Sequence, residues 1–223
     1  MQETNIIFFG APGAGKGTQA KKISTSLNLP HIDTGNLIRE AISNQTELGK
    51  KAKGFVESGN LVPDDLVIDL IKEKLLDLKK SRNGSFLGFI LDGYPRTIPQ
   101  ADALELMLSE LKLRLPKVIN VKAPEDILIK RLSSRRLCTN KSCGAIYNLI
   151  TKKPKIENTC DLCGETLYQR KDDTEEAAKQ RLNEYNNKTA PLEKYYRDMN
   201  NLFDVDGTKS PDDVFGEIRK QIQ

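Results

Sequence analysis

The stretch NIIFFGAPGAGKGTQ, residues 5–19, joins a short apolar run to a loop with four glycines, a proline, a lysine and a threonine. The apolar run predicts a buried strand that ends at Gly10, and a helix is expected to begin near Lys16. Glycines let backbone N–H groups approach phosphate oxygens, and the N-terminus of a helix adds a favourable dipole. The pattern therefore predicts a loop that holds the phosphates of a nucleoside triphosphate.

Two polar side chains of this loop suit a triphosphate. Lys16 can reach the β- and γ-phosphates, and Thr18 offers a hydroxyl near the phosphates and their Mg²⁺. An ordinary tight turn between a strand and a helix is the alternative, but the strand, the spacing, the lysine and the helix all favour a phosphate loop. The motif has one departure from the usual pattern, because Gly17 stands between Lys16 and the hydroxyl residue.

Outward from this stretch, short apolar and β-branched segments alternate with longer helical patterns. The segments are HIDTG from His31, GFILDG from Gly88, KVINVKAP from Lys117 and NLFDVDGT from Asn201. Between HIDTG and GFILDG, residues 64–80 carry apolar side chains at the i, i+3 and i+4 spacing of a helix with one buried face. The alternation predicts an α/β fold with a central parallel sheet between two helical layers, the three-layer fold of phosphate-loop NTPases. Ligands of such sheets bind at the carboxyl ends of the strands.

Two segments interrupt the alternation and are interpreted as insertions into one core. Residues 36–62 hold helical patterns, and residues 137–171 carry all four cysteines. The predicted core then consists of residues 1–35, 63–136 and 172–223.

The composition excludes several classes of protein. The chain has 223 residues, 38% of them hydrophobic, which is enough for the core of one large domain. Its formal net charge of +4 does not favour nucleic-acid binding through charge alone. No apolar run approaches the roughly 18 residues of a membrane span, and MQET shows no charged leader. We expect a soluble, cytoplasmic protein, in which cysteines fit metal ligands or free thiols better than disulfides.

The variant phosphate loop GAPGAGKGT resembles that of the adenylate kinase family. The resemblance extends over nearly the whole chain, through DTGNLIRE, GNLVPDD, GFILDGYPRT, PQA, KRLSSRR, YQRKDD and AKQRLNEYNNKTAPLEKYY. It implies a nucleoside monophosphate kinase that transfers a phosphoryl group reversibly from ATP, with Mg²⁺, to AMP and gives two ADP, which serves adenine nucleotide homeostasis. It also implies that residues 36–62 bind AMP, that residues 137–171 form a lid, and that the protein is a monomer without nucleic-acid or membrane partners.

The resemblance assigns residues to each substrate. ATP is expected to contact the phosphate loop and three basic residues: Gly10, Ala11, Pro12, Gly13, Ala14, Gly15, Lys16, Gly17, Thr18, Arg131, Arg135 and Lys209. AMP is expected to contact Thr34, Gly35, Arg39, Leu61, Val62, Gly93, Arg96, Gln100, Arg170 and Arg181. The residues expected to act in the transfer itself are Lys16, Asp92, Arg96, Arg135, Arg170 and Arg181. Arginine suits these positions because it is a permanently charged, bidentate donor to phosphate, although any single arginine could instead be a solvated surface charge.

Three features near GFILDGYPRT carry their own chemistry. Asp92 ends an apolar strand, which places its carboxylate beside the phosphate loop, where it can orient Mg²⁺-bound water; a turn or cap aspartate is the alternative. Gln100 has an amide that can donate to and accept from the edge of adenine, whereas taken alone it fits a surface position. Tyr94–Pro95 is a candidate cis peptide bond. The only histidine, His31, is interpreted as structural.

The cysteines form two closely spaced pairs, Cys138-x4-Cys143 and Cys160-x2-Cys163. Two such pairs are what a tetrahedral site with four thiolates requires, so the spacing favours structural zinc. Some adenylate kinases carry a zinc site of this kind in the lid. Their first pair is normally spaced by two residues, however, and unligated thiols are the alternative.

Other functions fit the sequence less well. A GTP-dependent switch protein would need Asn-Lys-x-Asp, but NKSC at Asn140 ends in a cysteine. A zinc ribbon that binds nucleic acid is suggested by lysines near the cysteines, Lys141, Lys152, Lys153 and Lys155, but that segment lacks interleaved aromatic residues. Within the family, GTP as the donor and another monophosphate as the acceptor stay open.

Overall fold

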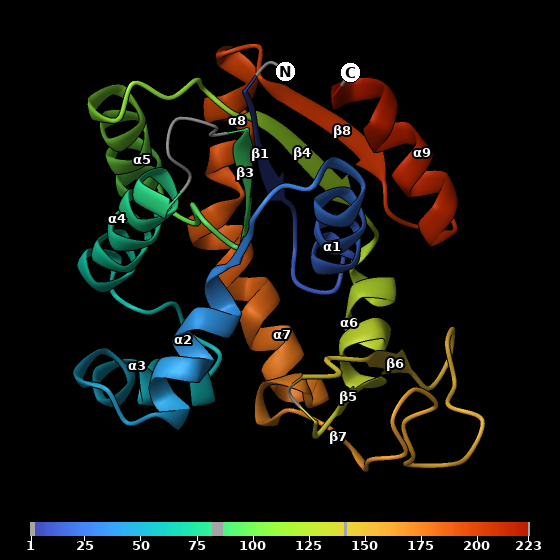
Figure 1. The fold of residues 1–223 in the computed structure, drawn as a ribbon. Coiled ribbons are helices and arrows are strands. Elements are labelled where there is room, and N and C mark those ends of the chain that lie inside the picture. Colours follow the sequence, from blue (N-terminus) through green and yellow to red (C-terminus); the bar gives the residue numbers. More distant parts are fainter. Residues whose placement is uncertain (1–2, 82–86, 141, 223) are drawn as a thin grey trace.

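The computed structural model describes residues 3–81, 87–140 and 142–222. Its centre is a five-stranded parallel sheet with the order β2-β3-β1-β4-β8 (Figure 1). The strands are β1 (Thr4–Phe9), β2 (His31–Asp33), β3 (Gly88–Asp92), β4 (Lys117–Lys122) and β8 (Leu202–Asp206). Each segment predicted to be a strand is one, so the predicted parallel sheet is confirmed.

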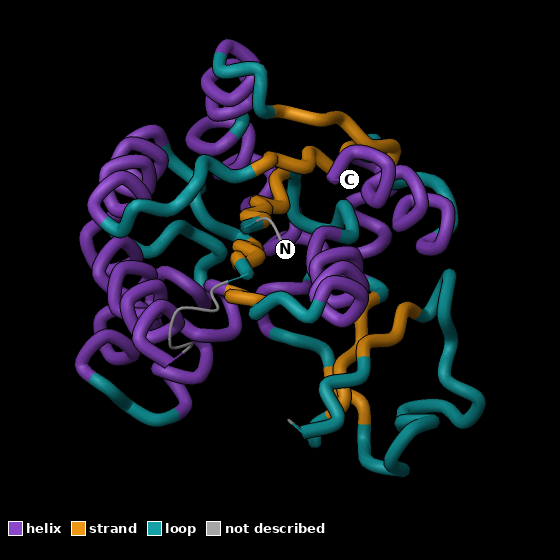
Figure 2. The backbone as a smooth tube through the Cα atoms, turned by 45° about the horizontal axis from the view of Figure 1, so that its top comes forward, coloured by secondary structure: helices purple, strands orange, loops and turns teal. Residues whose placement is uncertain are grey.

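Helices cover both faces of this sheet (Figure 2). Side chains alternate between the faces along a strand, and in β1 Ile6 and Phe8 join one core cluster while Ile7 and Phe9 join another. The first cluster includes buried residues of α1 (Lys16–Leu27) and α9 (Pro211–Ile222). The second includes those of α4 (Asp64–Ser81), α5 (Ile98–Glu110) and α8 (Pro191–Asp198). The predicted three-layer α/β fold is therefore confirmed, and so is the helix predicted over residues 64–80.

The carboxyl ends of three strands meet at one edge of the sheet. Asp92 of β3 lies opposite Phe8 of β1 on one side and opposite Asp33 of β2 on the other. From this edge β1 continues into the phosphate loop, and β2 continues into α2 (Thr34–Ser43). Asp33 caps α2, because its Oδ1 accepts a hydrogen bond of 2.9 Å from the backbone N–H of Asn36.

The predicted first insertion, residues 36–62, holds all of α2 except its first two residues and all of α3 (Glu47–Glu57), and the two helices pack against each other. Their close approach depends on Gly49, because a Cβ atom at this position would lie 2.1 Å from the carbonyl oxygen of Ala41. After α6 (Glu125–Ser133), the chain forms a small antiparallel sheet with the order β6-β5-β7, which lies apart from the main sheet (Figures 1 and 2). Its strands are β5 (Arg135–Cys138), β6 (Ile146–Asn148) and β7 (Leu167–Tyr168).

The chain returns to the core through a nearly continuous helical segment. A 3₁₀ turn, η1 (Lys171–Asp173), precedes α7 (Glu175–Glu184), and a π-helical turn, η2 (Tyr185–Thr189), joins α7 to α8. The Tyr94–Pro95 peptide bond is cis, as the sequence suggests. Within the described ranges, no helix combines the length and the apolar character that a membrane span needs. Lys141 lies outside the described residues, as do residues 1–2, 82–86 and 223 of the predicted core.

Candidate active site

The phosphate loop turns through glycines with positive φ and leads directly into α1. Gly15, the residue before α1, has φ of 103°, a conformation that favours glycine. A Cβ atom at Gly17 would lie 3.1 Å from Asp92 Oδ2, so a larger residue there would crowd the carboxylate. This contact gives a physical reason for the glycine after Lys16, and it places Asp92 beside the loop as predicted. The ammonium of Lys16 donates to the carbonyl oxygens of Gly10 at 2.7 Å and Ala11 at 2.8 Å.

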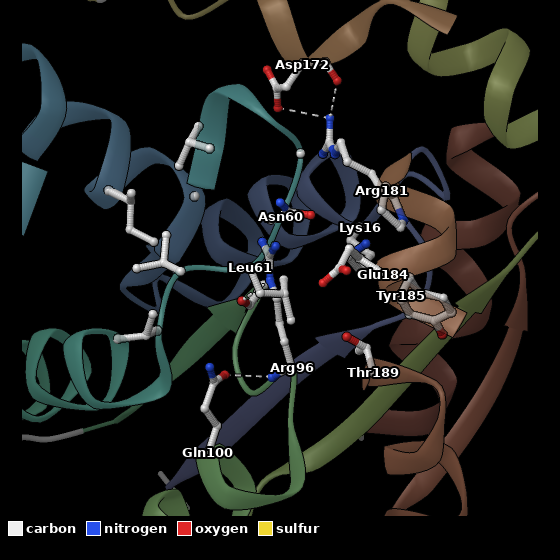
Figure 3. A pocket seen from close by; sticks show the side chains of 18 of the residues that line it. Lys16, Asn60, Leu61, Arg96, Gln100, Asp172, Arg181, Glu184, Tyr185 and Thr189 are labelled. Carbon is white, nitrogen blue, oxygen red and sulfur yellow. Dashed lines mark hydrogen bonds and ion pairs between the residues drawn. The ribbon is translucent and has the colours of Figure 1, made fainter. Parts of the chain in front are cut away.

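A cavity lies next to this loop, between the first insertion, the segment after β3 and the helical segment α7–η2 (Figure 3). The predicted site residues that line it are Gly10, Pro12, Lys16, Gly35, Arg39, Leu61, Val62, Gly93, Arg96, Gln100 and Arg181. Residues assigned to the donor and residues assigned to the acceptor therefore face one cavity. It is also lined by residues that the sequence did not indicate: Ile38, Val56, Gly59, Asn60, Val67, Asp172, Glu184, Tyr185 and Thr189.

Two buried aspartates hold two of the predicted arginines. Arg135 donates from Nε and Nη2 to the two oxygens of Asp173 at 2.8 and 2.5 Å. Arg181 donates from Nη1 to Asp173 Oδ1 at 3.0 Å and lies 3.1 Å from Asp172 Oδ2, a contact drawn in Figure 3. Asp173 is fully buried, so these charge-assisted bonds fix the guanidinium groups before a ligand binds.

The basic groups around the cavity are desolvated and repel one another. Burial lowers the pKa of Lys16 to about 8, against the opposing effect of Asp92. Burial and the neighbouring Arg170 lower the pKa of Arg39 to about 10, and burial also lowers the pKa of Arg96. Positive charge that is held away from water in this way is stabilised by an anion, and a polyphosphate supplies several negative charges. The electrostatics therefore favour a phosphate ligand.

Gln100 is buried at the wall of the cavity, with both ends of its amide engaged. Its Oε1 accepts from the backbone N–H of Arg96 at 2.8 Å, and its Nε2 donates to Asp64 Oδ1 at 2.7 Å. Figure 3 shows the first of these bonds and the side chain at the cavity wall. Each amide atom can make one further hydrogen bond, since the oxygen has a second lone pair and the nitrogen has a second N–H.

The other predicted site residues lie outside the cavity wall: Ala11, Gly13, Ala14, Gly15, Gly17, Thr18, Thr34, Asp92, Arg131, Arg135, Arg170 and Lys209. Arg131 donates to the carbonyl oxygen of Gly207 at 2.8 Å, and Arg170 donates to Asn36 Oδ1 at 3.5 Å. Lys209 pairs with Glu217. His31 Nε2 lies 3.6 Å from Asp92 Oδ2, so the only histidine stands behind the aspartate of the site.

The four cysteine sulfurs lie within 4.8 Å of one another. Cys138 Sγ is 3.4 Å from Cys163 Sγ, and Cys143 Sγ is 3.8 Å from Cys160 Sγ. These distances exceed the roughly 2.05 Å of a disulfide bond, and they suit the corners of a tetrahedron around a metal with bonds of about 2.3 Å to sulfur. All four cysteines are free thiols, and their arrangement fits a zinc ion.

The longer first pair closes through a local turn. Asn140 Oδ1 accepts from the backbone N–H groups of Ser142 at 3.0 Å and Cys143 at 3.3 Å, which ties Cys143 back to Asn140. In the second pair, burial opposes ionisation of Cys160, but hydrogen bonds from the backbone of Leu162 and from the Tyr147 hydroxyl lower its pKa. Burial instead raises the pKa of Cys138 and Cys143, so these two thiols would lose their protons only when the metal binds.

Sequence reasoning missed the acidic partners of the site. Asp172 and Asp173 stand in the motif YQRKDD, of which only Arg170 received a role, and Asp64 stands in GNLVPDD, from which only Leu61 and Val62 were taken. Adjacent carboxylates beside a cluster of arginines are a signal that could have indicated them, since buried arginines need counter-ions.

Comparisons with known proteins agree over nearly the whole chain. The family model described as adenylate kinase matches residues 8–201. A curated adenylate kinase of Archaeoglobus fulgidus is 51% identical over 221 residues, which covers 98% of this chain and 98% of that protein. Curated adenylate kinases of Thermosipho melanesiensis and Methanocella arvoryzae are 49% and 48% identical, and each alignment covers 98% of this chain.

Proposed function

The chain belongs to the adenylate kinase family, and from this premise we propose that its cavity holds AMP against an ATP seated on the phosphate loop. Members of this family transfer a phosphoryl group between ATP and AMP, so the chain is a phosphotransferase. The observation that carries the proposal is the single cavity that Lys16 of the loop shares with Arg39, Arg96 and Gln100.

The proposed reaction is a direct in-line displacement. A phosphate oxygen of AMP forms a bond to the γ-phosphorus of ATP, while the bond from that phosphorus to the bridging oxygen of the leaving ADP breaks. The attacking oxygen is already ionised, so no general base is required. Lys16, Arg96 and Arg181 then serve mainly to neutralise negative charge and to hold the two nucleotides in line.

The remaining roles follow the assignments made from the sequence. We assign the donor to residues 10–18 with Arg131, Arg135 and Lys209, the acceptor phosphate to Arg39 and Arg96, and contact with both nucleotides to Arg170 and Arg181. Mg²⁺ that arrives with ATP supplies positive charge at the phosphates, and the family uses it. Asp92, which stands beside the loop, is the residue proposed to orient its bound water.

We further propose that the two insertions, residues 36–62 and 137–171, close over the core formed by 1–35, 63–136 and 172–223. Lys171 Nζ lies 3.1 Å from Glu57 Oε1, which links the end of the lid to α3. Closure would exclude water, which otherwise accepts the phosphoryl group and converts the enzyme into an ATPase. A cytoplasmic monomer that acts in adenine nucleotide homeostasis, with neither nucleic acid nor a membrane as a partner, completes the proposal.

The choice of acceptor tests the proposed role of Gln100. Its amide can pair with the amino group and the adjacent ring nitrogen of adenine, whereas Gln100→Ala removes both partners. We expect the variant to raise the Michaelis constant for AMP by about 10- to 100-fold, because the two lost hydrogen bonds together cost about 1–3 kcal/mol, and to leave the Michaelis constant for ATP nearly unchanged. The measurement is a coupled assay with AMP, GMP and UMP as acceptors and with ATP and GTP as donors.

Gln221→Ala is the control, since this glutamine is exposed on α9, away from the cavity. A wild-type enzyme that uses GMP or UMP as well as AMP would show that adenine is not read here. Unchanged selectivity in Gln100→Ala would remove the residue from the acceptor site.

Removal of metal tests the cysteine site. We propose that Cys138, Cys143, Cys160 and Cys163 hold one structural Zn²⁺, which is remote from the reaction because all four ligand positions are filled by protein. Stripping the ion should lower the melting temperature of the lid, since metal binding is coupled to folding, and added Zn²⁺ should restore it. Elemental analysis of protein purified without chelators should find about one zinc per chain. Four thiols that react at once, with no zinc, would contradict the site.

A further inference from the structure

The two partners of the Gln100 amide determine its orientation. A backbone N–H, that of Arg96, can only donate, so the amide atom 2.8 Å from it is the oxygen. A carboxylate can only accept, so the amide atom 2.7 Å from Asp64 Oδ1 is the nitrogen. A rotation of the amide by half a turn would set N–H against N–H at Arg96 and oxygen against oxygen at Asp64. Gln100 is 2% exposed, so water cannot relieve either mismatch.

Asp64 is itself held in place by the fold. It is the first residue of α4, and its other oxygen, Oδ2, accepts from Thr97 Oγ1 at 2.8 Å. Thr97 caps α5 and its Oγ1 also accepts from the backbone N–H of Gln100 at 3.3 Å. The carboxylate thus lies where the N-termini of α4 and α5 meet, and their dipoles favour a negative charge there.

The fixed amide presents a defined pattern to the cavity. Its oxygen keeps a lone pair and its nitrogen keeps one N–H, and Gln100 lines the cavity (Figure 3). An acceptor next to a donor matches the 6-amino group and unprotonated N1 of adenine. A 6-oxopurine offers the reverse, a carbonyl oxygen and a protonated N1. A glutamine that could rotate would serve both bases, whereas a fixed glutamine serves only the first.

We propose that Asp64 is a specificity-determining positioning residue, which orients Gln100 so that the cavity accepts a 6-aminopurine monophosphate and rejects a 6-oxopurine monophosphate. Asp64 acts through Gln100 and does not itself contact the base. The inference rests on the proposed function, in which Gln100 reads the acceptor base.

The test compares AMP with inosine monophosphate, which differs from it only at the 6-position and N1. In the wild type, two mismatched polar groups should give AMP a preference on the order of 10²-fold or more in kcat/KM. Asp64→Asn replaces an obligate acceptor by an amide that can either donate or accept, so it releases one of the two constraints on Gln100. We expect the preference for AMP to fall about tenfold and kcat/KM for inosine monophosphate to rise in absolute terms.

Asp65→Asn is the matched control, because it removes the same charge from the same helix end at an exposed neighbour of Asp64. Asp64→Ser is a second variant, whose hydroxyl can also donate or accept, in case the first does not fold. A parallel loss for both substrates would show that Asp64 only supports the structure, and a preference equal to that of Asp65→Asn would overturn the proposal. Gln100→Ala distinguishes a failure of this proposal from a failure of the proposed function. If that variant keeps the preference for AMP, Gln100 does not read the base, and Asp64 cannot act through it.

Discussion

Lys16→Met should lose about 10³-fold in kcat while the protein stays folded. Lys16 is the only charged residue among residues 10–18, and its ammonium can stay close to the phosphoryl group during transfer. Its stabilisation of the transition state therefore grows as negative charge moves between the nucleotides. Among the described residues, its hydrogen bonds go only to the carbonyl oxygens of Gly10 and Ala11. Burial opposes its charge and lowers its pKa to about 8, so methionine at this position relieves a desolvation cost. We therefore expect a melting temperature at or above that of the wild type.

Steady-state kinetics and thermal unfolding of the same preparation check both parts of this expectation. Lys21→Met is the control, since Lys21 is exposed on the same helix. A Lys16→Met enzyme with nearly normal kcat would refute the role given to the loop, whereas a variant that unfolds early would show that Lys16 is structural.

Asp92→Asn should lose about 10²- to 10³-fold in kcat, because a neutral amide cannot orient Mg²⁺-bound water as a carboxylate does. The substitution should also change the pH dependence. Asp92 raises the pKa of Lys16, so its loss lowers that pKa further, and the lysine becomes neutral at a lower pH. Because kcat/KM reports the ionisation of the free enzyme, its decline at alkaline pH should begin at a lower pH in the variant than in the wild type.

Profiles of kcat/KM between about pH 6 and pH 10 test this, with Asp69→Asn on the exposed face of α4 as the control. If the alkaline decline of kcat/KM occurs at the same pH in Asp92→Asn and in the wild type, Asp92 does not influence the pKa of Lys16. Full activity with Mg²⁺ would exclude the carboxylate from the metal's surroundings.

The sheet and its helical layers could be predicted because each strand is a short apolar run and the loops between elements carry their own turn chemistry. The phosphate loop and Asp92 were predictable for a related reason, since β1 and β3 place them by local geometry alone. Gln100 was assigned only through the family resemblance, because taken alone it fits a surface position, whereas the structure buries it. The partners of these residues were not predictable. Asp64 contacts Gln100 and Asp173 contacts Arg135 across 36 and 38 residues of sequence, and no local pattern encodes such pairs.

The burial and the counter-ions of the arginines could not be predicted from the sequence either. The sequence shows six arginines at family positions, but it does not show that Arg39 and Arg96 are desolvated or that Arg135 and Arg181 share Asp173. Burial and shared counter-ions come from tertiary packing, and they decide which arginines stay available for phosphate. The first cysteine pair is a further example, because its four-residue spacing does not reveal the turn that Asn140 closes.

The central claim is that one cavity transfers the phosphoryl group directly from ATP to AMP. The most direct test is product analysis by ³¹P nuclear magnetic resonance of purified protein with ATP, AMP and Mg²⁺. The account predicts that ADP forms at two molecules per ATP consumed, that inorganic phosphate does not accumulate, and that ATP and AMP reappear when the reaction starts from ADP. Release of inorganic phosphate at the rate of ATP loss, or no ADP beyond one per ATP, would contradict it.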